Sequence, residues 1–135
     1  MPYVNPDEAP NRFALDVDAL RREMGPPPWR KPLVGSPNTR WVIIGLPPGY
    51  MTIPHRHPRA EETFYILQGE ALFRFGGEDQ DRRVGPGTLL LAPRDLMHTI
   101  GVPGSEPLVF VCSVTPNEDA ADETIEHPDA QGVSL

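Results

Sequence analysis

The sequence predicts an all-β domain, closed as a sandwich or barrel and preceded by a short helix and an arm. Eight short apolar runs follow one another between Thr39 and Thr115, separated by proline or glycine turns, which is typical of antiparallel sandwiches and barrels. The 18 prolines in 135 residues are dispersed and bracket the apolar runs. They therefore indicate rigid turns between strands, whereas a low-complexity chain would carry them in biased tracts.

Length and charge distribution indicate one domain with two appendages. A chain of 135 residues is long enough for one core and too short for two domains. We expect an N-terminal arm over residues 1–38, a β-barrel over residues 39–115 and an acidic tail over residues 116–135. From Asp95 onward there are no Lys or Arg residues and eight acidic ones, so the tail is expected to aid solubility.

Residues 16–24 predict a short helix. Asp16 is a suitable N-cap, and Val17, Leu20 and Met24 fall on one helix face. A glycine and three prolines at residues 25–28 end the helix, because proline cannot continue it. The rest of the arm, through Pro37, has turn residues throughout and is expected to wrap the outside of the barrel.

The barrel strands are predicted from apolar runs that lie between turn signals. They are expected over residues 39–46, 50–57, 62–68, 70–75, 82–84, 88–92, 96–102 and 108–115, with a polar hairpin tip at residues 76–81. The C-terminal segment is weakly specified, and helical character is expected there, at most, over residues 122–126.

Two histidines one residue apart are the main functional signal. His55 and His57 lie in a predicted strand, where residues i and i+2 point to the same face, so both imidazoles are expected to aim at one point. Pro54 and Pro58 flank the pair and restrict its backbone. A restricted backbone lowers the ordering cost of closing a metal site around the two rings.

A carboxylate follows the histidine pair at one of two neighbouring positions. Glu62 opens a strand in which Phe64 and Ile66 share its face, whereas an inward Glu61 would bring Thr63 into the core. The more apolar inner face favours Glu62 as the residue that points inward.

A third histidine, His98, stands in a second segment bounded by glycine and proline. Imidazole and carboxylate groups suit borderline divalent ions such as Fe, Mn, Ni, Cu and Zn. The alternative is that residues 55–57 form a solvated turn beside a polar loop. The nearby carboxylate and the third histidine favour a metal site over that alternative.

The spacing of these residues resembles the two motifs of the cupin superfamily. Gly49, His55, His57, Glu62 and Gly69 are separated by five, one, four and six residues, which matches the first motif in full. The second motif is matched by Gly87, Pro93, Asp95 and His98, separated by five, one and two residues. It departs at Asp95, where glycine is common, and at Val102, where asparagine is common. The resemblance covers residues 39–115.

The resemblance implies a double-stranded β-helix, or jelly-roll barrel, of the small single-domain metal-binding kind. Carried over position by position, the metal ligands of the family fall on His55, His57, Glu62 and His98. The implied cofactor is a divalent transition metal. The asparagine that Val102 replaces is not a ligand, so this departure leaves the implied ligand set complete.

Composition excludes several classes of partner and location. There is no clustered Lys and Arg surface for a nucleic acid and no apolar run long enough to span a membrane. The N-terminus has neither a basic start nor a hydrophobic region, so no signal peptide is expected. The single cysteine, Cys112, permits no intramolecular disulfide. A cytoplasmic location is therefore expected, with Cys112 a buried packing residue rather than a nucleophile.

A homodimer is expected from the apolar faces that the strand pattern leaves outside. If Glu62 points inward, Tyr65 and Leu67 point outward, and the strand over residues 39–46 is apolar on both faces. Such patches mark interaction surfaces, and the resemblance also implies dimerisation. The alternative is that the N-terminal arm covers them.

The function is predicted less sharply than the site. A redox metal would permit oxygen chemistry, and a redox-silent ion would permit isomerisation, cyclisation or lyase chemistry. We expect a metal-dependent enzyme that acts on a small enolic, phenolic or carboxylate substrate. Dioxygenase chemistry is preferred over isomerase, cyclase or lyase chemistry. A non-catalytic small-molecule binder is the further alternative. Strand aromatics such as Phe64, Phe73 and Phe110 would line an apolar pocket or simply fill the core.

Overall fold

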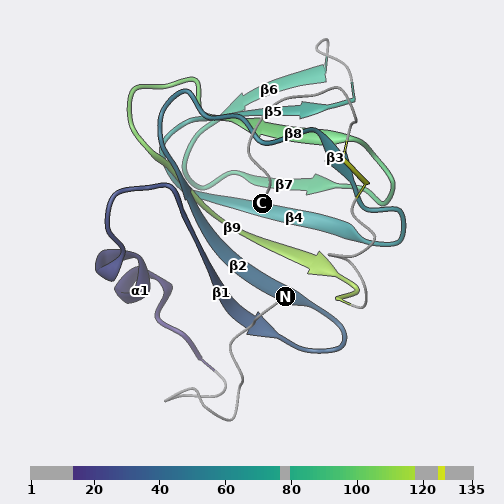
Figure 1. The fold of residues 1–135 in the computed structure, drawn as a ribbon, viewed down its shortest axis with the longest axis horizontal. Coiled ribbons are helices and arrows are strands. Elements are labelled where there is room, and N and C mark those ends of the chain that lie inside the picture. The colour runs from purple at the N-terminus through teal and green to yellow at the C-terminus, as the bar shows by residue number, and fades with distance from the viewer. Residues whose placement is uncertain (1–13, 77–79, 118–124, 127–135) are drawn as a thin grey trace.

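The protein folds into two five-stranded antiparallel sheets that face each other, with one short helix outside them (Figure 1). The computed structural model describes residues 14–76, 80–117 and 125–126. One sheet has the order β1-β2-β9-β4-β7 and the other β10-β3-β8-β5-β6. The elements are α1 (Val17–Glu23), β1 (Trp29–Gly35), β2 (Arg40–Leu46), β3 (His55–Arg56), β4 (Glu61–Gln68), β5 (Ala71–Phe75), β6 (Asp81–Val84), β7 (Leu89–Ala92), β8 (His98–Gly101), β9 (Leu108–Thr115) and β10 (Ile125–Glu126).

This architecture confirms the predicted all-β jelly roll with a short N-terminal helix. Strands that follow one another in the chain mostly alternate between the two sheets, from β2 through β3 and β4 to β8 and β9. The helix begins where it was expected, because the Asp16 side chain accepts a hydrogen bond of 2.9 Å from the Ala19 amide. No helix in the described part of the chain is long and apolar enough to cross a membrane.

The arm after the helix is a strand, and the expectation of turns wrapped around the barrel is wrong there. Residues Trp29–Gly35 form β1, which pairs with β2 along the edge of the first sheet. Pro32 is compatible with this position because an edge strand has one side that needs no ladder hydrogen bond. A register shift between Pro32 and Val34 marks a bulge in this strand. The prolines of the arm suggested turns, but an edge strand accommodates Pro32.

Two further strand predictions need correction. Residues 50–57 form an isolated bridge at Met51 and the two-residue strand β3, so His57 lies beyond the strand. Ile125 and Glu126, placed in a weak helix by sequence, form the short strand β10 against β3, while residues 122–124 lie outside the described residues. The remaining strands agree with the predicted ranges to within about two residues.

The main core fills the space between the sheets. Alternate residues of β2, β4 and β9 point into it, including Ile44, Ile66 and Phe110. Phe64, Phe73 and Phe110 are 2% exposed or less, so these aromatics are core residues rather than the lining of an open pocket. The alternation also places Glu62 on the inner face, as predicted.

The outer face of the first sheet is partly covered and partly exposed. Leu15, Val17 and Leu20, at and just before α1, pack on a second cluster that includes Ile43 and Val109, and Leu67 packs against the same cluster. Apolar side chains farther along the same face stay exposed: Trp41, Tyr65, Leu89 and Leu91. Leu67 is therefore partly buried on the outer face, whereas Tyr65 is exposed there, as expected. The expected dimer stays a prediction.

Candidate metal centre

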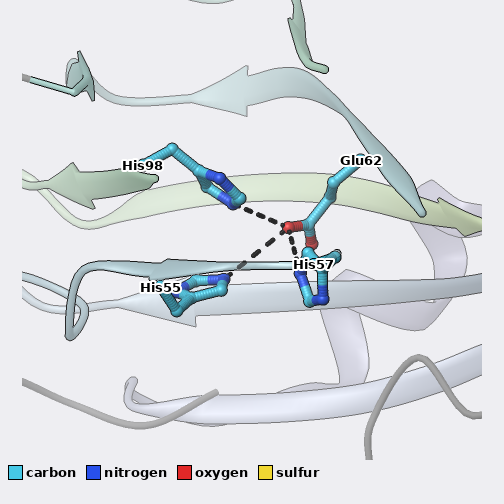
Figure 2. Close-up of side chains that lie close together, drawn as sticks. All are labelled: His55, His57, Glu62 and His98. Carbon is cyan, nitrogen blue, oxygen red and sulfur yellow. Dashed lines mark hydrogen bonds and ion pairs between the residues drawn. The ribbon is translucent and has the colours of Figure 1, made fainter. Parts of the chain in front are cut away.

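The four predicted ligands meet at one point inside the barrel. His55 comes from β3, His57 follows that strand, Glu62 lies in β4 and His98 begins β8. The Glu62 Oε1 atom lies 3.8 Å from His55 Nε2, 3.2 Å from His57 Nε2 and 3.1 Å from His98 Nε2. Figure 2 shows the three rings directed at this carboxylate oxygen. The structure thus brings together every residue of the predicted site.

The histidine pair reaches this point by a different local geometry from the one predicted. Only His55 lies in a strand, where it pairs with His98 of β8. His57 lies just past β3, and its carbonyl accepts hydrogen bonds from the Asp95 amide at 2.9 Å and the Ala60 amide at 3.4 Å. These backbone contacts hold the His57 turn, so convergence of the rings does not depend on an extended strand.

Backbone carbonyls orient two of the three imidazoles. His55 Nδ1 lies 2.8 Å from the Ile53 carbonyl oxygen, and His98 Nδ1 lies 2.9 Å from the Leu96 carbonyl oxygen. A carbonyl only accepts, so Nδ1 carries the hydrogen in both rings. In a neutral imidazole this leaves the lone pair on Nε2, the atom that faces the carboxylate. Backbone contacts of this kind commonly fix the tautomer of metal-binding histidines.

The donor atoms fit a divalent cation. Nε2 of His55, Nε2 of His98 and the oxygen of Glu62 all present lone pairs to the same small space, and the four side chains offer ligand atoms within 4.8 Å of one another. Without a cation or added protons, such atoms repel each other. Bonds of about 2.0–2.2 Å to nitrogen and oxygen would place neighbouring ligands near the separations seen here. Metal binding itself stays a prediction.

The environment of Glu62 favours its ionised form. Burial raises the pKa of Glu62, but hydrogen bonds from His55, His57 and His98, which need a proton on Nε2 when no cation is bound, outweigh burial and hold that pKa well below its usual range. The neighbouring Glu61 is exposed to solvent. Of the two carboxylates that the sequence left in competition, Glu62 is therefore the one that lies at the site.

Aromatic core residues form one wall of the centre. The Phe73 ring lies parallel to His98, with centroids 6.0 Å apart, and the Phe64 ring meets His98 edge-on at 5.8 Å. Both phenylalanines belong to the main core. The centre thus sits at the end of an apolar interior, where electrostatic interactions are stronger than in water.

The two departures from the second motif have structural reasons. Asp95 adopts a φ of 67°, a conformation that glycine takes easily and Asp tolerates better than most residues. Its carboxylate accepts a hydrogen bond from Arg56, which ties this turn to the histidine pair. Val102 is buried in the main core, so its apolar side chain is used for packing.

Two residues near the site had no functional role in the sequence-based prediction. Cys112 is buried, and burial, together with the Glu62 carboxylate, raises the pKa of its thiol well above the usual range. This agrees with a packing residue and disfavours a nucleophile. Arg40 is also buried, although it carries a charge. The sequence signal for a buried Arg40 was its position at the start of an apolar strand. An arginine that is buried there needs a polar partner.

Comparisons with known proteins agree with the geometry. Residues 42–114 match the family described as Cupin domain. Germin-like protein 3-8 of Oryza sativa subsp. japonica is 31% identical over 134 residues, which cover 89% of this chain and 56% of that protein. This chain therefore spans little more than half the length of that relative.

Solved structures extend the likeness. A conserved protein with a double-stranded β-helix domain from Klebsiella pneumoniae subsp. pneumoniae has a TM-score of 0.67 and 25% identity, covering 78% of this chain and 90% of that one. The DMSP lyase DddQ from Ruegeria pomeroyi has a TM-score of 0.61 and 27% sequence identity, and the match covers 71% of this chain and 47% of that one. A recombinant oxalate oxidase in complex with glycolate has a TM-score of 0.54 and 28% sequence identity, and the match covers 58% of this chain and 42% of that one.

Proposed function

This chain belongs to the cupin domain family, and on that premise we propose that it is a metal-dependent enzyme acting on a small enolic, phenolic or carboxylate substrate, with oxygen-dependent chemistry preferred. The observation that carries the proposal is the convergence of three imidazole nitrogens and one buried carboxylate on a single point. Nitrogen and oxygen donors of this kind select Fe, Mn, Ni, Cu or Zn.

The ligand count leaves room for a substrate. Four protein ligands on a six-coordinate ion would leave two positions, enough for a chelating substrate or for a substrate oxygen and dioxygen. A redox metal bound there would supply oxygen chemistry, whereas a redox-silent ion would act as a Lewis acid. The protein contributes the orientation of the ligands through the Ile53 and Leu96 carbonyls and the apolar wall formed by Phe64 and Phe73.

Similar proteins support oxygen chemistry and also a second candidate. The similarity to an oxalate oxidase supports an oxidase or dioxygenase reaction on a small acid. The similarity to a DMSP lyase supports the alternative, a lyase, isomerase or cyclase that needs no oxygen, and a non-catalytic binder remains the third candidate. The cytoplasmic location and the homodimer expected from the sequence stay predictions.

Metal content is the first test of this proposal. Untagged wild-type protein and the His98→Ala variant would be compared by mass spectrometry of bound metals. We expect near-stoichiometric transition metal in the wild type and little in the variant. A wild type that is empty and takes up no added metal would contradict the metalloenzyme.

An oxygen electrode then separates the candidate reactions. Oxalate, glycolate and a small panel of enols and phenols would be added to the metal-loaded protein, with and without oxygen. Oxygen uptake that depends on both metal and substrate supports the preferred reaction. Turnover under anaerobic conditions would instead support the lyase or isomerase, and saturable binding without turnover would support the binder.

A further inference from the structure

The segment that leads to His55 has one extra residue where it pairs with β8. Met51 bridges Gly101, and farther along the same two segments His55 pairs with His98. Four residue steps separate Met51 from His55, whereas three separate His98 from Gly101. One additional residue on one strand of an antiparallel pair makes a β-bulge, a feature that re-aims side chains beside functional sites.

The bulge determines which way His55 points. Residues directly opposite each other in an antiparallel pair share one face of the sheet, and a shift of one residue moves a side chain to the other face. If the pairing before the bulge continued regularly, Pro54 would lie opposite His98. With the bulge, His55 takes that place, so both imidazoles point at Glu62 (Figure 2).

Two buried threonine hydroxyls take part in the backbone hydrogen bonding at the bulge. Thr52 is 1% exposed and Thr99 is 2% exposed. The Thr52 amide donates to the Ile100 carbonyl at 2.9 Å, as in a regular ladder, but the Ile100 amide donates to the Thr52 hydroxyl at 3.0 Å. The Thr52 carbonyl accepts a hydrogen bond from the Thr99 hydroxyl. Side chains thus satisfy backbone groups at a place where a bulge disrupts the ladder.

The direction of each bond in the threonine pair follows from the number of hydrogens. The Thr99 hydroxyl has one hydrogen and donates it to the Thr52 carbonyl, which can only accept. The Thr52 hydroxyl is therefore the donor in the 3.0 Å contact between the two hydroxyl oxygens. Each hydroxyl depends on the other, so a side chain of the same shape without the oxygen would leave buried polar groups unpaired.

The threonine pair lies next to the carbonyl that orients His55. Ile53 follows Thr52, and its carbonyl oxygen lies 2.8 Å from His55 Nδ1. The Thr52 carbonyl belongs to the planar peptide group that joins Thr52 to Ile53, so the bond from Thr99 fixes the plane from which Ile53 starts. Pro54 then restricts the backbone up to His55. The direction of the His55 ring therefore depends on the two hydroxyls.

We propose that Thr52 and Thr99 are positioning residues of the metal centre: their hydroxyl pair holds the bulge that places His55 opposite His98 and aims its Nε2 atom at the metal. They act through His55 and not as ligands. Mutation of groups that support a ligand in this way typically weakens metal affinity by about 10- to 100-fold. The inference rests on the proposed function for its effect on the metal, whereas the placement of His55 is also a property of the metal-free protein.

A double-mutant cycle with His55 tests this role. Co²⁺ affinity would be measured by competition with a chromophoric chelator in full-length wild type, Thr52→Val, His55→Ala and the double variant. We expect Thr52→Val to weaken Co²⁺ binding at least about tenfold when His55 is present and less than about twofold when His55 is absent, because residues that act through one another are not additive. Thr52→Ser keeps the hydroxyl and should keep the wild-type affinity.

The absorption spectrum of bound Co²⁺ separates positioning from general destabilisation. At saturating Co²⁺, the bands of Thr52→Val should approach those of His55→Ala, whereas Thr52→Ser should give the wild-type bands. Val109→Ala is the control, because Val109 is buried in the second cluster on the outer face of the first sheet. This substitution should lower the stability of the fold and leave both the Co²⁺ affinity and the spectrum unchanged.

Two results of the cycle would overturn the inference. One is an unchanged Co²⁺ affinity in Thr52→Val, and the other is an equal loss of affinity with and without His55. If Thr52→Val does not fold, Thr99→Val decides by the same criteria, because it removes the other hydroxyl of the pair.

Measurements on metal-free protein separate this inference from the proposed function. The ring centroids of His55 and His98 lie 4.5 Å apart, close enough for a nuclear Overhauser effect between ring protons. The signal should be present in wild type and Thr52→Ser and weak or absent in Thr52→Val. If the wild type binds no Co²⁺ and the signal follows this pattern, only the proposed function fails. If Co²⁺ binds and Thr52→Val keeps the full signal, only the inference fails.

Discussion

His98 and Glu62 meet across the interior between the two sheets, with 3.1 Å between the His98 Nε2 atom and the Glu62 Oε1 atom. One residue belongs to β8 and the other to β4, which lie in different sheets, and 36 residues separate them in the chain. The site therefore exists only when the sheets pack together. Metal binding and folding should consequently be coupled, and the predictions below test the site and its coupling to the fold.

Glu62→Gln should lose metal, and Glu61→Gln should keep it. The two residues are adjacent and chemically identical, but Glu62 lies at the centre and Glu61 is exposed. Mutation of a group that merely supports a metal ligand typically weakens metal affinity by about 10- to 100-fold. Loss of the charged ligand itself should therefore weaken metal affinity by at least about tenfold. Competition with a chromophoric chelator measures the effect. Equal affinities in the two variants would refute the choice of Glu62.

Metal removal should lower the melting temperature. A metal that binds only the folded state adds about 2.7 kcal/mol of stability when its free concentration is a hundred times its dissociation constant. Each kcal/mol corresponds to roughly 2–8 °C in a small domain, so EDTA should lower the melting temperature by at least roughly 5 °C. Calorimetry measures this, and Glu62→Gln is the control that should barely respond. An equal shift in the variant would show that EDTA acts elsewhere.

Gly69→Ala should destabilise the fold far more than Gly76→Ala. Both glycines have positive φ values, 83° and 70°, and alanine there costs about 1–2 kcal/mol. At Gly69 a Cβ atom would also lie 2.3 Å from the Pro107 carbonyl oxygen, whereas at Gly76 it would meet no atom of the described residues within 4 Å beyond the adjoining chain. We expect a loss of more than about 2 kcal/mol at Gly69 alone, measured by urea unfolding. Similar losses in both variants would mean that backbone conformation, not the clash, decides.

Cys112 should resist thiol reagents in the folded protein. Its burial and the nearby Glu62 carboxylate raise the pKa of the thiol well above its usual range, so the reactive thiolate is suppressed in the folded state and forms only at higher pH than in a free cysteine. At about pH 8, near the ordinary pKa of cysteine, a disulfide reagent should label the native protein slowly and the unfolded protein quickly. One thiol per chain should react after unfolding. Rapid labelling of the native protein would contradict this prediction and support a nucleophilic role for Cys112, which the sequence disfavoured.

Much of the fold could be read from local patterns, because each depends on residues close together in the chain. Alternation placed Phe64 and Ile66 inward with Glu62, and the Asp16 cap started the helix as expected. Local patterns failed where tertiary pairing overrides them. Pro32 suggested a turn, yet the edge of a sheet accepts it as part of β1.

The histidine spacing led to the right side chains for a partly wrong reason. The i and i+2 rule assumed a strand through His57, but β3 ends at Arg56. The rings converge because backbone contacts at Ile53 and Leu96 orient two of them and the Asp95 amide holds the His57 turn. None of these contacts has a signature in the spacing of the motif.

By itself, the sequence determined the composition of the site and the inner face of each strand, because residue type and side-chain alternation are properties of a short stretch of chain. Only the tertiary structure decided which distant residues share a row. The register of β2, β9 and β4 places Arg40, Val114 and Glu62 in one row across the first sheet. Register is set by pairing between strands far apart in sequence, so this row of residues emerges only after folding.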